Sequence, residues 1–260
     1  SITALRYANR LYQLPLGIFA MAISTAFFPT MTRQVSVADY KGFKSTFSQG
    51  LGSILFITVP SSVGLIVLSQ PIVRLLFKSG SFTEANVRLT AFTLIFYSLG
   101  LFAYSAIQVI TRGFYAIKDT RTPVIIGAIA VGINIILNLA FVRFSNLALG
   151  GIAFSYSLAG IINMIMLLYI LSKKVGEIGL GGVIKTFGKS AVASAIMGVC
   201  VYFSYSGLTS VLGEVSKMSQ LISTGGSIIV GVAVFVLMSY ILKIDELDVI
   251  MDMIKRRIKK

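Results

Sequence analysis

The chain has 260 residues, of which 56% are hydrophobic and only 12% are charged. A soluble domain of this length carries about 25% charged residues, so an ordinary soluble domain is excluded. There are 23 Lys and Arg against 9 Asp and Glu, a formal net charge of +14. Such a basic excess is typical of proteins that bind nucleic acid or an anionic membrane surface, and the hydrophobicity favours the membrane. Because there is no His and only one cysteine, Cys200, a disulfide framework and a His- or Cys-based metal site are excluded.

Seven stretches without Asp, Glu, Lys or Arg follow one another along the chain. Each exceeds the roughly 20 residues that an α-helix needs to cross about 30 Å of hydrocarbon. None shows the alternating pattern of a transmembrane β-strand. The sequence therefore predicts an all-α, polytopic membrane helical bundle of about seven transmembrane helices, over residues 11–32, 45–73, 89–111, 122–142, 144–172, 190–213 and 218–242.

Basic residues in the loops predict the orientation, because they are enriched on the cytoplasmic side of a membrane. Of the 23 basic residues, 16 lie on one expected side of the membrane and seven on the other. The first side still has more basic residues when the C-terminal tail is left out. The C-terminus is therefore expected in the cytoplasm and Ser1 outside. A chain that begins outside with Ser and no cleavable signal is expected to lack an odd number of preceding helices. The residues on the expected cytoplasmic side are Arg33, Lys41, Lys44, Arg112, Lys118, Arg121, Lys173, Lys174, Lys185, Lys189, Lys243, Lys255, Arg256, Arg257, Lys259 and Lys260.

Two amphipathic segments outside the spans are expected to lie on the membrane surface. In the first loop, aromatic residues fall at i, i+3 and i+7: Tyr40, Phe43 and Phe47. The tail has the same helical spacing beside a basic cluster that would contact anionic lipid. The alternative for both segments is a solvated helix or a short coiled-coil seam. The apolar residues of the tail are Ile244, Leu247, Met251, Ile254 and Ile258.

Enzymatic chemistry lacks its usual groups. All nine acidic residues lie in loops or in the tail, so no carboxylate pair lies within a span. Without His, general acid–base catalysis and two-metal chemistry have no obvious residues. An intramembrane carboxylate for proton coupling and a glycine-rich phosphate loop are also missing. We therefore expect no enzyme, no catalytic residues and no cofactor.

A cationic face on the first span is the candidate binding site. Arg6, Asn9, Arg10 and Gln13 fall at i, i+3, i+4 and i+7, so they share one side of a helix. A mid-membrane arginine costs about 2.5–3.5 kcal/mol on insertion scales, so it normally faces a cavity or a partner. Its planar guanidinium suits bidentate binding of phosphate. From Arg10 to Thr32 a straight helix rises roughly 33 Å, so snorkelling of Arg10 to the outer interface is an equal alternative.

Polar residues in later spans have packing as their first interpretation. Asn134 and Asn138 are one helical turn apart in the fourth span. Such pairs usually join helices through hydrogen bonds, and a cation site built from their carbonyl oxygens is the alternative. Ser155, Ser157 and Asn163 in the fifth span are interpreted in the same way.

Several sequence strings, taken together, resemble the MurJ (MviN) family of lipid II flippases, within the multidrug/oligosaccharidyl-lipid/polysaccharide exporter superfamily. The resemblance is strong over about residues 1–175 and weak over the last two spans. Because the strings occur in the family's order and spacing, they are more specific together than any one alone. They are YANRLYQLPLG at 7–17, AIST at 22–25 with Pro29, LFKSGSFT at 76–83, GFYA at 113–116 and DTRTP at 119–123.

The resemblance implies a transporter of fourteen helices, arranged as two six-helix lobes and two additional helices. Residues 1–175 would supply five helices of the second lobe, 176–243 the additional pair, and 244–260 a basic amphipathic cytoplasmic tail. The absent N-terminal lobe would be a partner. The additional pair would form a groove for the polyprenyl tail of the substrate.

The resemblance also implies roles for individual residues. In the family, the arginine of the Tyr-Ala-x-Arg-Leu string lines the central cavity and is thought to engage the diphosphate of lipid II. This role maps onto Arg10, with Arg6, Asn9 and Gln13 beside it; some members have Asp where this chain has Asn9. Some relatives are thought to bind sodium near the fourth and fifth helices, which indicates Asn134 and Asn138, although no carboxylate accompanies them here.

The functional prediction is a flippase that moves lipid II, the undecaprenyl-diphosphate-linked peptidoglycan precursor, to the outer leaflet by alternating access. It implies a multi-pass protein of the bacterial inner (plasma) membrane that acts in cell wall biogenesis and cell shape. Membrane lipids are expected partners and nucleic acid is not. A monovalent cation or the membrane potential would supply the energy.

Four alternatives remain. A polysaccharide-repeat-unit flippase and a multidrug exporter belong to the same superfamily; multidrug exporters usually use intramembrane carboxylates, whereas arginines suit anions. A polyprenyl-phosphate enzyme would need a cluster of loop carboxylates. A non-transporting cell-wall scaffold would show no transport of labelled lipid II.

Overall fold

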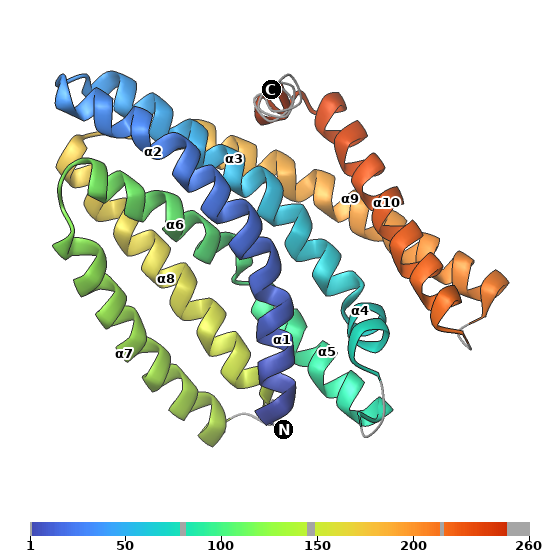
Figure 1. The fold of residues 1–260 in the computed structure, drawn as a ribbon. Coiled ribbons are helices and arrows are strands. Elements are labelled where there is room, and N and C mark those ends of the chain that lie inside the picture. Colours follow the sequence, from blue (N-terminus) through green and yellow to red (C-terminus); the bar gives the residue numbers. More distant parts are fainter. Residues whose placement is uncertain (1, 79–81, 145–148, 214–215, 249–260) are drawn as a thin grey trace.

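The computed structural model describes residues 2–78, 82–144, 149–213 and 216–248. All elements within these ranges are helical, which confirms the predicted all-α class (Figure 1). They are α1 Ile2–Pro15, the π-helical η1 Leu16–Ala20, α2 Met21–Ser36, α3 Tyr40–Val67, α4 Ser69–Phe77, α5 Glu84–Ser98, α6 Leu101–Ala116, α7 Arg121–Phe144, α8 Leu149–Val175, α9 Leu180–Leu212 and α10 Lys217–Ile241.

The number of spans agrees with the prediction when one bent helix pair is counted as a single crossing. Six helices in the described ranges are long and apolar enough to cross a membrane. The first of them joins α1, η1 and α2 into one stretch, Thr3–Ser36. A seventh crossing is obtained from α5 and α6, which pass the same test together and are bent by 43°.

Two of the predicted spans are interrupted. In residues 45–73, where Pro60 and Pro71 predict an interruption, the chain breaks at Leu68 between α3 and α4, while α3 continues through Pro60. Pro71 lies in the first turn of α4 and has no N–H to continue the hydrogen-bond ladder of α3, so the sequence favours a new helix start there. Residues 89–111 break in the same way at Leu99 and Gly100.

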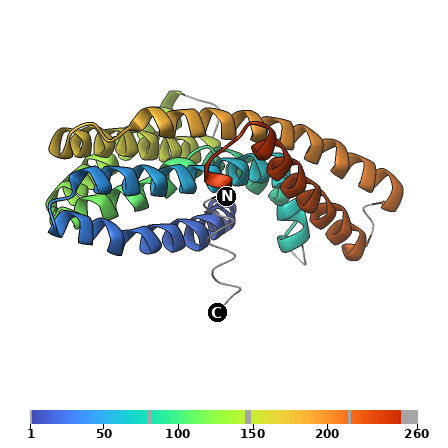
Figure 2. The same cartoon turned by 90° about the horizontal axis from the view of Figure 1, so that it is seen from above.

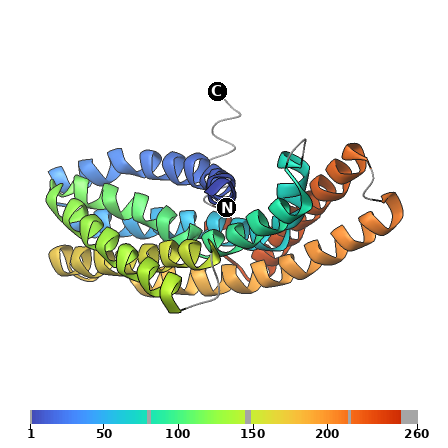
Figure 3. The same ribbon diagram turned by 90° about the horizontal axis from the view of Figure 1, so that it is seen from below.

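The helices pack in layers around α3 and α6. In the views from above and below, these two helices lie between α2 on one side and α8 and α9 on the other (Figures 2 and 3). The largest apolar cluster lies at this centre and includes Phe47, Ile54, Ile110, Phe114 and Leu167, all nearly inaccessible. The α9–α10 pair extends to one side, where α9 packs against α3 and α10 contacts α4.

The aromatic residues of the first loop do not lie on the membrane surface, so that prediction is wrong. Phe43 and Phe47 are fully buried in the central cluster, and only Tyr40 is exposed. Their segment is the first part of α3, which begins where the Asp39 carboxylate accepts a hydrogen bond from the N–H of Gly42, at 2.8 Å. An i, i+3, i+7 aromatic stripe suits a protein core as well as a lipid surface, and neighbouring helices cover this one.

The start of the predicted amphipathic tail is also packed against the bundle. Ile244 is buried, and Leu247 packs beside it on the cluster that joins α3, α9 and α10. Met251, Ile254 and Ile258 lie outside the described residues, and the surface location of that part stays a prediction.

A close approach between α8 and the α5–α6 break requires a glycine. A Cβ added to Gly100 would lie 2.8 Å from the Cα of Ser157. The hydroxyl of Ser157 donates a hydrogen bond to the carbonyl of Phe96, at 2.6 Å, which holds α8 at this distance. The interpretation of Ser157 as a packing residue is therefore confirmed.

Replacing Gly100 by Ala should destabilise the protein by about 1–3 kcal/mol, because the obstructing atom is backbone and cannot rotate away. The measurement is the apparent melting temperature of the purified protein. Gly132→Ala in α7 is the matched control, since an added Cβ there meets nothing within 4 Å. Equal melting temperatures for the two variants would contradict this account of the α5–α8 contact.

Candidate substrate-binding site

The four polar residues predicted on the first span lie together on α1. Arg6, Arg10 and Gln13 are exposed and Asn9 is partly exposed. The side-chain amide of Gln13 donates a hydrogen bond to the carbonyl oxygen of Asn9, at 3.0 Å. Within the described ranges, neither guanidinium has an ion pair or a hydrogen bond. This cationic face of α1 thus presents two positive charges without a counterion.

The opposite side of α1 determines which way the arginines point. Tyr12 is fully buried, with its ring centre 5.8 Å from that of Tyr97, 6.3 Å from Tyr104 and 6.0 Å from Tyr156. Ala8 and Leu11, on the same side, are buried in the cluster that contains Tyr97. Because the helix is anchored by this side, rotation that buried Arg10 against α5 would expose the tyrosine.

The span changes direction just beyond the cationic face. Pro15 ends α1 and η1 follows as one π-helical turn, after which α2 continues along a different line (Figure 1). A proline within a helix removes one backbone hydrogen bond, and π-helical turns are often found at functional sites. The exposed side chains that follow, Ile18 and Met21, are apolar. The polar face is therefore limited to one end of the span.

An apolar groove of about 370 Å³ lies between α3 and α4 on one side and the α9–α10 pair on the other. Its walls come from α3, α4, α9 and α10, and Phe19 of η1 also lines it. The groove therefore touches the same span as Arg10, nine residues further along. Its one side-chain hydroxyl, that of Ser61, is bonded to the carbonyl of Ile57 at 2.8 Å, so the lining offers little polarity.

The asparagine pair of the fourth span lies on α7 and bonds to itself. The amide of Asn138 donates to the carbonyl oxygen of Asn134, at 3.1 Å. The carbonyl oxygen of Asn138 is therefore buried and has no hydrogen bond among the described residues. The same is true of the carbonyl oxygen of Asn163 on α8. No cluster of three or more His, Cys, Asp or Glu that could hold a metal ion is found in the same part of the chain. A cation site at the pair stays a prediction.

Membrane-spanning helices, a cationic face without counterions in the described ranges and an apolar groove are typical of a polytopic membrane protein of the transporter class. The family model described as "Lipid II flippase MurJ" matches residues 1–223, and the chain belongs to this family.

Individual relatives agree with that assignment. The chain is 31% identical to a probable lipid II flippase MurJ of Rhizobium meliloti over 98% of its own length and 48% of the relative's. It is 37% identical to the lipid II flippase MurJ of Thermosipho africanus over 77% of its own length and 39% of the relative's. A solved structure titled "Lipid II flippase MurJ, inward closed conformation" matches 94% of this chain and 47% of its own, at 34% identity and a TM-score of 0.75. The chain thus spans about half the length of the relatives it matches, and these relatives are named flippases.

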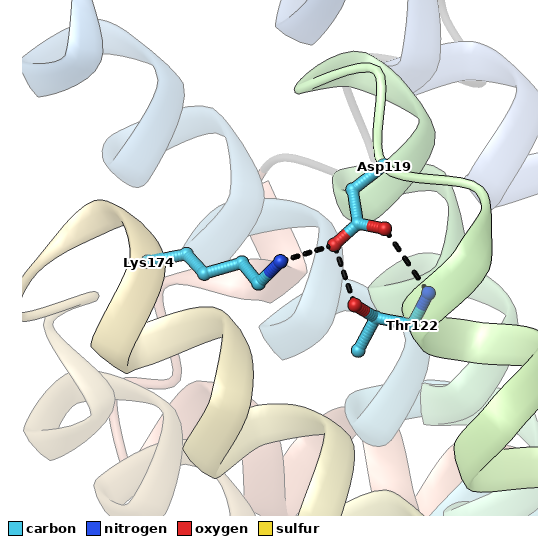
Figure 4. A network of polar contacts seen from close by, with 3 residues as sticks. All are labelled: Asp119, Thr122 and Lys174. Atoms are coloured by element: carbon cyan, nitrogen blue, oxygen red, sulfur yellow. Dashed lines mark hydrogen bonds and ion pairs between the residues drawn. The ribbon is translucent and has the colours of Figure 1, made fainter.

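A polar network that sequence reasoning missed holds the DTRTP string in place (Figure 4). The carboxylate of Asp119 accepts hydrogen bonds from the N–H of Thr122, at 3.0 Å, and from its hydroxyl, at 2.6 Å. Lys174, at the end of α8, forms an ion pair with the same carboxylate at 2.6 Å. Partial burial alone would raise the pKa of Asp119, but the bonds from Lys174 and Thr122 outweigh it and lower the pKa to about 2. Asp119 therefore caps α7 and ties it to α8.

This carboxylate should make stability depend on pH in the acid range. A lowered pKa means that the stabilisation is complete above the ordinary aspartate value of about 4 and is lost as the pH falls towards 2. Asp119→Asn keeps a capping side chain but removes the ion pair, and Asp119→Ala removes both. Because Lys174 is half exposed, we expect Asp119→Asn to lower the free energy of unfolding by about 0.5 kcal/mol and Asp119→Ala to lower it by about 1–2 kcal/mol. Both values are measured by denaturation at pH 7.

The difference between wild type and Asp119→Asn should shrink as the pH is lowered from 5 to about 2. A difference that stays constant over this range would show that the Asp119 carboxylate does not titrate as described.

Proposed function

We propose that this chain forms the second lobe and the additional helix pair of a lipid II flippase, which moves the lipid-linked peptidoglycan precursor to the outer leaflet by alternating access. The observation that carries the proposal is the cationic face of α1, with Arg6 and Arg10 exposed and without counterions in the described structure. Membership of the MurJ family, and the names of the relatives, support lipid II as the substrate.

Arg10 is the principal ligand of the substrate diphosphate in this proposal. A guanidinium donates two parallel hydrogen bonds to a phosphate, and such charge-assisted bonds are roughly twice as strong as neutral ones. Arg6 lies one turn away on the same face and adds a second charge. Since Asn9 accepts its bond from Gln13, the N–H groups of the Asn9 amide remain available for phosphate or sugar oxygens.

The exposed position of these arginines supports a hydrated cavity rather than contact with lipid tails. Each guanidinium facing mid-membrane hydrocarbon costs about 2.5–3.5 kcal/mol, which a partner lobe and water would remove. Transfer of an unpaired diphosphate into hydrocarbon has a far larger free-energy cost, so the diphosphate needs a cationic route. Rocking of two lobes around such a cavity would expose the site to each side of the membrane in turn.

The apolar groove is the proposed place of the polyprenyl tail. A hydrocarbon chain loses nothing by leaving lipid for a lining of aliphatic and aromatic side chains. Phe19 brings the groove to the span that carries Arg10, about 13 Å along the helix axis. One substrate molecule can therefore place its diphosphate at α1 and its tail between α3 and α10.

A monovalent cation gradient or the membrane potential would drive the cycle in this proposal. The unbonded carbonyl oxygen of Asn138 is the ligand that α7 offers to a cation. It would need further oxygen ligands from elsewhere, because Asn134 gives its oxygen to Asn138.

Arg10→Ala in the full-length protein should reduce transport of labelled lipid II in proteoliposomes by at least about tenfold, the effect of losing one charge-assisted bond to phosphate. Growth of a flippase-depleted strain should no longer be rescued, while membrane insertion is unchanged. Arg10→Lys should recover part of the activity, because it restores the charge without the planar fork. Arg33→Ala, at the other end of the same span, is the control. Normal growth and transport with Arg10→Ala would reject the role of Arg10.

Gly64→Phe should block the groove without disturbing the fold. Gly64 lines the groove, and a Cβ there meets nothing within 4 Å, so the ring would occupy the space of the tail. Gly127→Phe on α7 is the matched control, because it also enters open space but lines no part of the groove. Transport of lipid II with its native tail should fall several-fold in Gly64→Phe alone. An analogue with a short tail should be carried equally by both variants, and equal transport of the native substrate would contradict the tail site.

A further inference from the structure

A second cavity, of about 470 Å³, is lined by residues of α4 and by residues near the starts of α5 and α10. Only polar or charged side chains line it: Gln70, Arg74, Lys78, Glu84, Arg88 and Gln220. None of them belongs to the cationic face of α1 or to the apolar groove. In the orientation expected from the basic residues, this end of the bundle faces the outer side of the membrane.

The cavity carries an excess of positive charge. Three basic side chains surround one carboxylate, that of Glu84. Arg74 and Lys78 form ion pairs with this carboxylate, and the Lys78 nitrogen is 2.9 Å from it. Arg88 is exposed on α5 and has no ion pair or hydrogen bond in the described part of the chain. Among the described residues, Arg88 therefore lacks an anion that would balance its charge.

The polar cavity and the apolar groove are lined by different residues of the same two helices, α4 and α10. Leu68, just before α4, and Ile72 of α4 line the groove, whereas Gln70 and Arg74 of α4 line the polar cavity. On α10, Ile228 lines the groove and Gln220 the cavity, eight residues apart and so about 12 Å along the axis. A molecule that fits both must be an amphiphile with an anionic head and a hydrocarbon chain.

We propose that this cavity binds the phosphate headgroup of an anionic phospholipid, with one acyl chain entering the adjacent end of the groove. Arg88 and Lys78 bind the phosphate, and the amide side chains of Gln70 and Gln220 bond the glycerol oxygens. The bound lipid bridges α4 and α5 of the lobe to α10, and so holds the additional helix pair against the lobe. The inference does not depend on which substrate the whole protein carries.

The test is a lipid titration of the purified full-length protein, monitored by native mass spectrometry and by thermal unfolding. Phosphatidylglycerol should bind and raise the melting temperature. Phosphatidylcholine with the same acyl chains should bind more weakly, and glycerol 3-phosphate, which has no chain, should neither bind nor stabilise. Lys78→Gln with Arg88→Gln should weaken the tightest phosphatidylglycerol site by at least about tenfold, since each basic group near anionic lipid is worth about fivefold.

Two controls separate loss of binding from loss of folding or of net charge. Arg33→Gln with Lys41→Gln removes the same charges from exposed positions on the other side of the bundle and should leave phosphatidylglycerol binding unchanged. Arg88→Gln alone breaks no ion pair in the described structure, so it should weaken lipid binding about fivefold without lowering the melting temperature of the lipid-free protein.

Three results would overturn the proposal. The first is unchanged phosphatidylglycerol affinity in Lys78→Gln with Arg88→Gln and in Arg88→Gln alone. The second is binding of glycerol 3-phosphate as tight as that of phosphatidylglycerol and equally dependent on Arg88, which would make the cavity a site for free phosphates. The third is that binding of a polyprenyl phosphate depends on Arg88 while binding of phosphatidylglycerol does not, which would assign the cavity to a substrate-like lipid.

Discussion

The free-energy cost of placing polar and charged groups in hydrocarbon governs where this chain puts them. Within the long helices, several hydroxyl groups bond to their own backbone: Thr58 donates to the carbonyl of Ile54 at 2.8 Å, and Ser227 to that of Ser223 at 2.7 Å. Acidic side chains in the described part are found at the helix ends, where Glu84 and Asp119 each have a basic partner. Against this background, Arg6 and Arg10 stand out, because they are exposed on a helix that continues into an apolar span and have no counterion in the described structure.

The tyrosine cluster behind α1 gives that exposure a structural cause. Four large rings, those of Tyr12, Tyr97, Tyr104 and Tyr156, hold α1 against α5, α6 and α8. Because aromatic rings of this size cannot be exchanged for guanidinium groups without leaving a void, the cluster sets the rotation of α1 about its axis. The direction of the cationic face is therefore determined by packing on the other side of the same helix.

Local patterns in the sequence predicted much of this architecture, and long-range contacts account for what they missed. Uncharged runs located the spans, and the i, i+3, i+4, i+7 spacing placed Arg6, Asn9, Arg10 and Gln13 on one face, as the structure has them. Pro71 predicted an interruption close to the break at Leu68, whereas hydropathy alone did not, because a break between two apolar helices leaves composition unchanged. The burial of Phe43 was predicted wrongly, since an aromatic stripe does not tell lipid from protein.

Sites assembled from several elements were not predicted from the sequence. The partner of Asp119 is 55 residues away, and the polar cavity joins Arg88 to Gln220 across more than a hundred residues. No periodicity connects such positions, so only the packing of α4, α5 and α10 brings them together. The resemblance to a known family predicted a groove beside the additional helix pair but not that Phe19 would line it.

Phe19 lies just after Pro15, in η1, so the two parts of the proposed substrate site meet at the bend of the first span. Pro15 has no N–H to bond the carbonyl of Leu11, and η1 replaces the regular hydrogen-bond ladder directly after it. Bending at this point therefore has one backbone hydrogen bond fewer to break than bending within a regular α-helix. In the proposed cycle, α1 carries the diphosphate and η1 touches the tail, so a change of angle between α1 and α2 would move the headgroup while the tail stays in its groove. The bend is then the part of the lobe at which headgroup movement and tail retention are mechanically separated.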